Sequence, residues 1–236
     1  MTDLWRRTIT GLGYAAVVLA AAFAPPAVFT LILGGAAVIA LLELWALRRA
    51  GAAAIIALLE LWTLRRAGVA ACLELAVLAL GVAALLFLFV QGDARAAHAA
   101  AAGLPVWLLL AIGATWAADV GAYAIGSLVG RRKIAPRISP GKTWEGTFGG
   151  FGAAALAVLG ISALFGLGRT DAALAALTIG PVAFGGDLLE SWVKRRAGVK
   201  DSGAIFPGHG GMLDRIDSLL AVAILVAGLS LALHLG

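Results

Sequence analysis

The chain has 236 residues, of which 62% are hydrophobic and only 13% are charged, and its formal net charge is +5. Soluble domains carry about 25% charged and about 45–50% apolar residues, so this composition excludes a soluble globular protein and predicts an integral membrane protein. A membrane helix needs about 20 mainly apolar residues, which leaves no room for a separate soluble catalytic domain.

Seven apolar segments predict an all-α, polytopic membrane bundle of about seven transmembrane helices. In chain order they are Thr8–Ala24, Ala27–Leu47, Val69–Val90, Leu104–Val129, Trp144–Leu167, Ala172–Val193 and Leu219–Leu235. We expect a single membrane-embedded domain over residues 1–236. Its N-terminal spans lie in 1–100, and most of its polar motifs lie in 104–220.

A tandem repeat occupies residues 34–67, where Gly34–Ala50 and Gly51–Ala67 are identical at 14 of 17 positions. Two such short copies are too few for a solenoid. The second copy has about thirteen apolar residues before Arg65, which suits an interfacial or re-entrant helix better than a span. We interpret it as a duplication tolerated at the cytoplasmic surface, with a functional membrane-surface helix as the alternative.

Basic residues cluster between the apolar segments on one predicted side of the membrane. If the N-terminus with Arg6 and Arg7 lies inside, every Lys and Arg except Arg95 and Arg169 lies inside as well. Because short-loop Lys/Arg bias sets orientation, we expect a multi-pass inner-membrane protein with a cytoplasmic N-terminus. The basic clusters act as topology signals, so they indicate no nucleic-acid partner.

A first group of polar residues lies in and after the fourth apolar segment. Asp119 is inside Leu104–Val129, and Ser-Pro-Gly-Lys-Thr-Trp-Glu-Gly follows at 139–146. An ionisable residue in a membrane span is costly and predicts a functional site. We expect substrate binding by Asp119, Ser139, Lys142, Thr143 and Glu145. The alternative for Thr143 is helix capping.

A second polar group lies at the end of the sixth segment. Asp187, Glu190, Ser191 and Lys194 have the spacing i, i+3, i+4 and i+7, which places them on one helix face. We expect this face to turn into the bundle interior near its cytoplasmic end, with Glu190, Ser191 and Lys194 as substrate-binding candidates. The alternative is an exposed Glu190–Lys194 pair at the membrane boundary, worth a few tenths of a kcal/mol. That alternative leaves Asp187, deeper in the span, unexplained.

The head of the last apolar segment repeats this spacing with Asp214, Asp217 and Ser218. Carboxylates in a first helical turn can simply complement the helix dipole. Together with Asp187, however, they form two acidic helix faces able to converge. Such faces suit Mg²⁺, which binds one or two carboxylates, water and substrate phosphates.

The segment 203–211 between these faces is too glycine-rich for a helix and predicts a loop. Its backbone N–H groups could form an anion-binding concavity. The cations around the loop, Lys194, Arg195, Lys200 and Arg215, could contact phosphates, although a basic loop that only sets topology is the alternative. His209 lies in the loop and is kept as a substrate-binding candidate, since a lone histidine is more often structural than catalytic.

These motifs closely resemble the phosphatidate cytidylyltransferase, or CDP-diacylglycerol synthase, family. The downstream pattern consists of Ser191, Lys194-Arg195, Lys200-Asp201, Gly203, Pro-Gly-His-Gly-Gly at 207–211 and Asp-Arg-Ile-Asp at 214–217. The upstream pattern consists of Asp-Val-Gly-Ala-Tyr at 119–123 and the segment 139–146. The resemblance covers residues 119–220, whereas the first hundred residues match only as apolar spans.

The resemblance implies transfer of a cytidylyl group from CTP to phosphatidate, giving CDP-diacylglycerol and diphosphate in phospholipid biosynthesis. It implies that Asp187 and Asp214 bind Mg²⁺ at the cytoplasmic face, with K⁺ as a further cation beside it. Lys200, Asp201 and Asp217 complete the expected catalytic group. CTP, phosphatidate and the bilayer are then the partners, and a homodimer is one option for the oligomeric state.

Two other functions stay open at this point. Another CTP-dependent lipid-modifying enzyme, such as a polyprenol or dolichol kinase, would also need Mg²⁺ and a basic pocket at the membrane surface. A transporter would use Asp119 and Asp187 as an ion site near the membrane midplane. The gathering of charges at one membrane face favours an enzyme.

Overall fold

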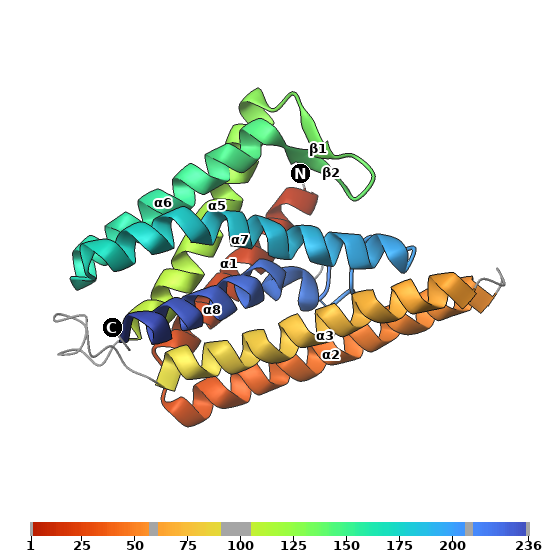
Figure 1. Ribbon diagram of the computed structural model, residues 1–236, viewed down its shortest axis with the longest axis horizontal. Coiled ribbons are helices and arrows are strands. Elements are labelled where there is room, and N and C mark those ends of the chain that lie inside the picture. Colours follow the sequence, from red (N-terminus) through yellow and green to blue (C-terminus); the bar gives the residue numbers. More distant parts are fainter. Residues whose placement is uncertain (1, 57–60, 91–104, 206–209, 235–236) are drawn as a thin grey trace. The chain divides into compact units, whose positions relative to one another are not determined.

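The computed structural model describes residues 2–56, 61–90, 105–205 and 210–234. Figure 1 shows its elements, which are α1 (Thr2–Ala22), α2 (Pro26–Ile56), α3 (Leu61–Val90), α5 (Val106–Val129), β1 (Lys133–Ala135), β2 (Ser139–Thr143), α6 (Trp144–Phe165), α7 (Arg169–Arg196) and α8 (Leu213–His234). Each predicted apolar segment overlaps one helix, although several helices, α2, α3 and α8 among them, extend beyond the predicted bounds. The predicted all-α polytopic membrane fold is therefore confirmed.

Six helices of the described chain are long and apolar enough to cross a membrane. They are α2, α3, α5, α6, α7 and α8, whereas the apolar part of α1 is the shorter stretch Leu12–Ala22. Apolar segments in a membrane form helices because a helix pairs the backbone N–H and C=O groups within the segment, where no water can bind them. The chain is a multi-pass membrane protein.

The second copy of the tandem repeat does not form the separate interfacial or re-entrant helix that we expected. Residues 51–56 continue α2, and residues 61–67 begin α3, while 57–60 lie outside the described residues. Helix-favouring Ala, Leu and Arg fill both copies, so the copy lengthens the two neighbouring helices.

The predicted loop between α5 and α6 contains an antiparallel hairpin. Lys133 pairs with Thr143 and Ala135 pairs with Ser139, with an irregularity between the two pairs. Thr143 then caps α6, because its hydroxyl accepts a hydrogen bond from the backbone N–H of Gly146 at 3.2 Å. The capping role considered for Thr143 is thus confirmed.

The chain divides into two compact units. Unit 1 contains residues 1–79 and 189–217, and unit 2 contains residues 80–188 and 218–236. The divisions fall inside α3, α7 and α8, so each of these helices supplies residues to both units.

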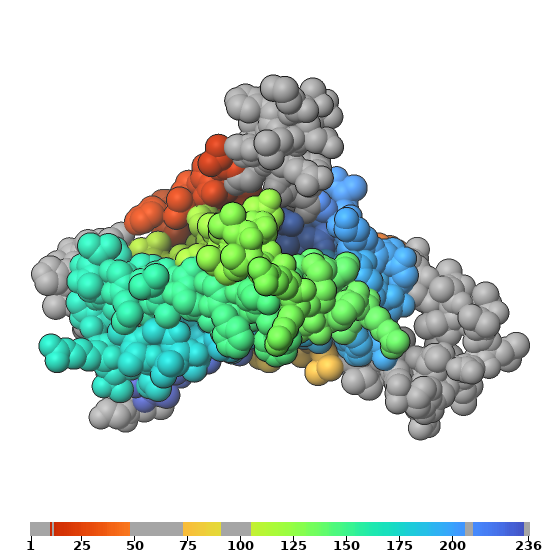
Figure 2. All heavy atoms as spheres, turned by 90° about the horizontal axis from the view of Figure 1, so that it is seen from above, coloured from red at the N-terminus to blue at the C-terminus, as the bar shows by residue number. Residues whose placement is uncertain are grey.

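Close packing of α5 against α6 organises unit 2, and Figure 2 shows the yellow-green atoms of α5 beside the green to turquoise atoms of α6. Glycines allow this approach. A Cβ atom at Gly150 would lie 2.7 Å from the carbonyl oxygen of Ala118, and one at Gly121 would lie 2.9 Å from that of Gly149. Small residues commonly permit such contacts between membrane helices. The packing fixes the start of α6 and the hairpin before it.

Candidate functional site

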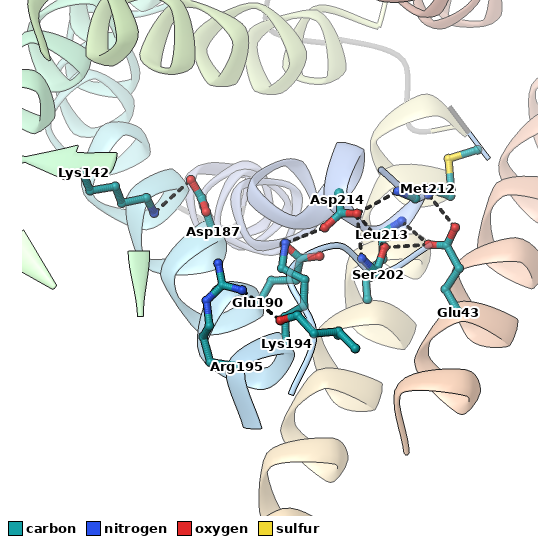
Figure 3. Close-up of polar contacts among 12 residues, drawn as sticks. Glu43, Lys142, Asp187, Glu190, Lys194, Arg195, Ser202, Met212, Leu213 and Asp214 are labelled. Atoms are coloured by element: carbon teal, nitrogen blue, oxygen red, sulfur yellow. Dashed lines mark hydrogen bonds and ion pairs between the residues drawn. The ribbon is translucent and has the colours of Figure 1, made fainter. Parts of the chain in front are cut away.

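A buried group of charges in unit 1 centres on Lys194, near the end of α7. Its Nζ lies 2.9 Å from Oε2 of Glu190 and 2.5 Å from Oδ1 of Asp214, as Figure 3 shows. Side-chain exposure is 10% for Lys194, 2% for Glu190 and 5% for Asp214. The Glu190–Lys194 pair is therefore buried, and the alternative of an exposed pair at the membrane boundary is wrong. Buried charges are expensive unless each finds a partner, which Lys194 supplies to both carboxylates.

The second carboxylate oxygen of Asp214 is held by the glycine-rich loop. Oδ2 accepts hydrogen bonds from the backbone N–H groups of Ser202 at 2.8 Å and Gly211 at 2.7 Å. The Ser202 hydroxyl lies 2.9 Å from the same oxygen. These two N–H groups, at the described ends of the loop, bind a carboxylate of the protein rather than the free anion that we expected.

Glu43, in the middle of α2, joins this group and was missed by the sequence analysis. It is buried, and it accepts hydrogen bonds from the N–H groups of Met212 and Leu213, each at 2.8 Å. The available signal was a carboxylate inside the apolar segment Ala27–Leu47, which is the argument applied to Asp119. We name Glu43, Glu190, Lys194, Ser202 and Asp214 the Asp214 cluster.

A second ion pair belongs to unit 2 and joins the hairpin to α7. Lys142 Nζ lies 2.9 Å from Oδ2 of Asp187, and it also lies 4.8 Å from the centre of the Phe184 ring (Figure 3). Asp187 retains 35% side-chain exposure, compared with 17% for Lys142. This carboxylate thus stays accessible while its charge is balanced.

Glu145 connects the end of α5 to the start of α6. Its carboxylate accepts hydrogen bonds from the N–H groups of Arg131 at 3.0 Å and Arg132 at 3.2 Å. These bonds give Glu145 a part in building the hairpin region. Its predicted contact with substrate stays a prediction.

The remaining predicted residues occupy three regions. Asp119 is exposed on α5 and Ser139 is half-buried on β2. At the end of α7, Ser191 is buried, and Arg195 is exposed and donates to the carbonyl of Val199 at 2.8 Å. The loop after α7 exposes Lys200 and Asp201, the first turns of α8 hold the half-buried Arg215 and Asp217, and His209 lies outside the described residues.

Asp187 and Asp214, the predicted metal ligands, fall in different units, so the metal pair stays a prediction. Within the part of the chain that the structure describes, no three Asp, Glu, His or Cys side chains converge as a complete metal-binding group. Mg²⁺ does not require one, because it usually takes only one or two protein carboxylates and completes its shell with water and phosphate oxygens. The hard oxygen donors of Asp187 and Asp214 fit that chemistry.

Comparison with known proteins adds an independent line of argument. The model of the cytidylyltransferase family matches residues 52–232. A phosphatidate cytidylyltransferase of Brucella suis is 47% identical over 112 residues, which make up 47% of this chain and 42% of that protein. One from Haemophilus influenzae is 50% identical over 113 residues, 45% of this chain and 39% of that protein.

A third relative, the uncharacterized protein YnbB of Escherichia coli, is 49% identical over 121 residues, 51% of this chain and 40% of that protein. The matches thus span less than half the length of each of these relatives. The family model matches residues 52–232, a range that includes both lysine–aspartate pairs.

Proposed function

The chain belongs to the cytidylyltransferase family, and from that premise we propose that it transfers a cytidylyl group from CTP to phosphatidate, forming CDP-diacylglycerol and diphosphate. A phosphate oxygen of phosphatidate forms a bond to the α-phosphorus of CTP. The bond from that phosphorus to the bridging oxygen of the β-phosphate breaks, and diphosphate leaves. Phosphatidate is ionised at neutral pH, so the step needs no side-chain nucleophile.

The observation that carries this proposal is the pairing of both candidate aspartates with lysines. Lys142 lies at Asp187 and Lys194 at Asp214. The reaction joins two polyanions, whose mutual repulsion must be offset, and in such transfers positioning and electrostatic stabilisation supply most of the catalysis. An ammonium held beside each carboxylate can turn to a phosphate when the carboxylate gains another cationic partner.

Asp187 and Asp214 are our proposed Mg²⁺ ligands, and a monovalent cation such as K⁺ is a further proposal. Their oxygen donors suit a hard cation, and each already lies within 3 Å of a positive charge. Bound Mg²⁺ would neutralise the triphosphate and stabilise the departing diphosphate.

The chain's own residues have separate proposed tasks. Lys194, Lys200 and Arg215 contact phosphates, and the hairpin residues Ser139 and Lys142 contribute to substrate binding. We place the site at the cytoplasmic face of the inner membrane, where a soluble nucleotide and a bilayer lipid can meet. The basic clusters of the sequence support this orientation through the positive-inside rule.

Two labelled forms of CTP test the proposal. Purified protein in detergent receives phosphatidate, Mg²⁺ and CTP labelled either at the α-phosphate or at the γ-phosphate, with and without chelator. We expect chelator-sensitive label in the lipid from α-labelled CTP alone. Lipid label from γ-labelled CTP with a polyprenol acceptor would instead identify a kinase. Solute uptake by proteoliposomes without nucleotide turnover would identify a transporter.

A further inference from the structure

Glu43 is a buried carboxylate whose partners are far away in the sequence. Oε1 accepts the N–H of Met212 at 2.8 Å, and Oε2 accepts the N–H of Leu213 at 2.8 Å. The Ser202 hydroxyl lies 2.9 Å from Oε2. All of these residues belong to unit 1, and Figure 3 shows the Glu43 carboxylate pointing toward Met212, Leu213 and Ser202.

These contacts make Glu43 a cap for α8. The first N–H groups of a helix lack partners within the helix, and their partial positive charge favours a nearby anion. Glu43 supplies that anion from α2. Since Asp214 directly follows Leu213, the cap fixes the helical turn that carries the aspartate.

The hydroxyl of Ser202 connects the two carboxylates. It lies 2.9 Å from Oε2 of Glu43 and 2.9 Å from Oδ2 of Asp214. A hydroxyl has one hydrogen to donate, so it can serve only one of them at a time. When Oδ2 of Asp214 turns to another partner, the hydroxyl can donate to Glu43 without leaving its hydrogen unpaired.

Two motif glycines leave the space that Glu43 occupies. A Cβ atom at Gly203 would lie 2.6 Å from Oε1 of Glu43, and one at Gly211 would lie 2.5 Å from the same oxygen. Real Cβ atoms do not approach that closely. These glycines are therefore explained by the approach of the carboxylate, with no need for a bound anion.

We propose that Glu43 is a positioning residue for Asp214, which it places by capping α8 and by sharing the Ser202 hydroxyl. The catalytic part of this inference rests on the function proposed above. Glu60 occupies the position of Glu43 in the second copy and lies outside the described residues, so it provides a matched control.

The experiment compares the wild-type protein with Glu43→Gln, Glu60→Gln, Ser202→Ala and the Glu43→Gln/Ser202→Ala double variant. Amide hydrogen exchange of the peptide containing Met212 and Leu213 is measured without substrates. Among the single variants, we expect faster exchange of this peptide in Glu43→Gln alone. Ser202→Ala keeps the hydrogen bonds from the N–H groups of Met212 and Leu213 to Glu43. Unchanged exchange in Glu43→Gln would overturn the inference, as would faster exchange in Glu60→Gln.

Turnover supplies the second readout. We expect Glu43→Gln to lower kcat by about 10–100-fold, as loss of an orienting partner typically does, with the KM for CTP nearly unchanged. Its effect should shrink in the Ser202→Ala background, because the two residues act through one hydroxyl. Additive effects of the two substitutions, or a rise in KM alone, would contradict the positioning role. If wild-type protein shows no turnover, the proposed function fails, and the exchange comparison alone decides the capping role.

Discussion

Replacing Lys194 with Met tests the Asp214 cluster most sharply, because Met removes the ammonium with little change in side-chain length. Lys194 is the partner of Glu190 at 2.9 Å and of Asp214 at 2.5 Å. In the variant, Asp214 keeps the hydrogen bonds to its Oδ2 from Ser202 and Gly211. Glu190 keeps a buried carboxylate and loses the cation beside it.

The size of the effect follows from burial. Exposure of 2% for the Glu190 side chain places the pair in the class of buried ion pairs, for which removal of one partner costs about 3–5 kcal/mol. The double variant Lys194→Met/Glu190→Met removes one of the two buried carboxylates that Lys194 balances, and the other, Asp214, keeps its hydrogen bonds from Ser202 and Gly211. We expect it to lose only the bond to Asp214, about 1.5–3 kcal/mol, and so to be more stable than the single variant.

Unfolding by SDS in mixed micelles measures these free energies, with Lys133→Met as the matched control on an exposed strand residue. The control should change stability by no more than about 0.5 kcal/mol. A Lys194→Met variant as stable as this control would refute the reasoning. A double variant no more stable than the single one would also refute it. We expect both Lys194 variants to lack CDP-lipid formation.

Three further substitutions test other parts of the account. Gly150→Leu should destabilise the protein by about 1–3 kcal/mol in the same unfolding assay. Gly152→Ala should not, because a Cβ atom at Gly152 meets nothing within 4 Å. Equal effects of the two substitutions would contradict the close α5–α6 contact. Thr143→Ala should cost about 1 kcal/mol through loss of the α6 cap, and Thr143→Ser should restore it; failure of serine to do so would argue against capping. Asp187→Asn should lower the free energy of unfolding by at most about 1 kcal/mol, because the pair of Asp187 with Lys142 is partly exposed. It should nevertheless lower CDP-lipid formation by about 10²–10³-fold. Near-normal turnover would show that this carboxylate is not part of the site.

Hydrophobic patterning was sufficient to predict the helices, because membrane spans must be long and apolar. The i, i+3, i+4 and i+7 spacing also predicted that Glu190 and Lys194 share a face, which the structure shows as a buried ion pair. The hairpin was not predictable in this way. Its strands, Lys133–Ala135 and Ser139–Thr143, are short and show no alternation of apolar and polar residues.

The role of Glu43 could not be read from local spacing, since its partners Met212 and Leu213 lie 169 and 170 residues away. The same limit applies to the glycine-rich loop. Its composition correctly predicted that a backbone N–H of the loop binds an anion, but the anion at Gly211 is the carboxylate of Asp214. Only the tertiary structure distinguishes an internal carboxylate from an external phosphate.

The most direct test of the central claim is the rate of label transfer from α-labelled CTP to phosphatidate by wild-type protein and Asp214→Asn. Both are assayed with Mg²⁺ after the folded fraction has been measured by size-exclusion chromatography, and Lys133→Met serves as the surface control. We expect labelled CDP-lipid from the wild type and the control, and a loss of at least about 10²-fold per folded molecule in Asp214→Asn. Wild-type rates in Asp214→Asn would contradict the account.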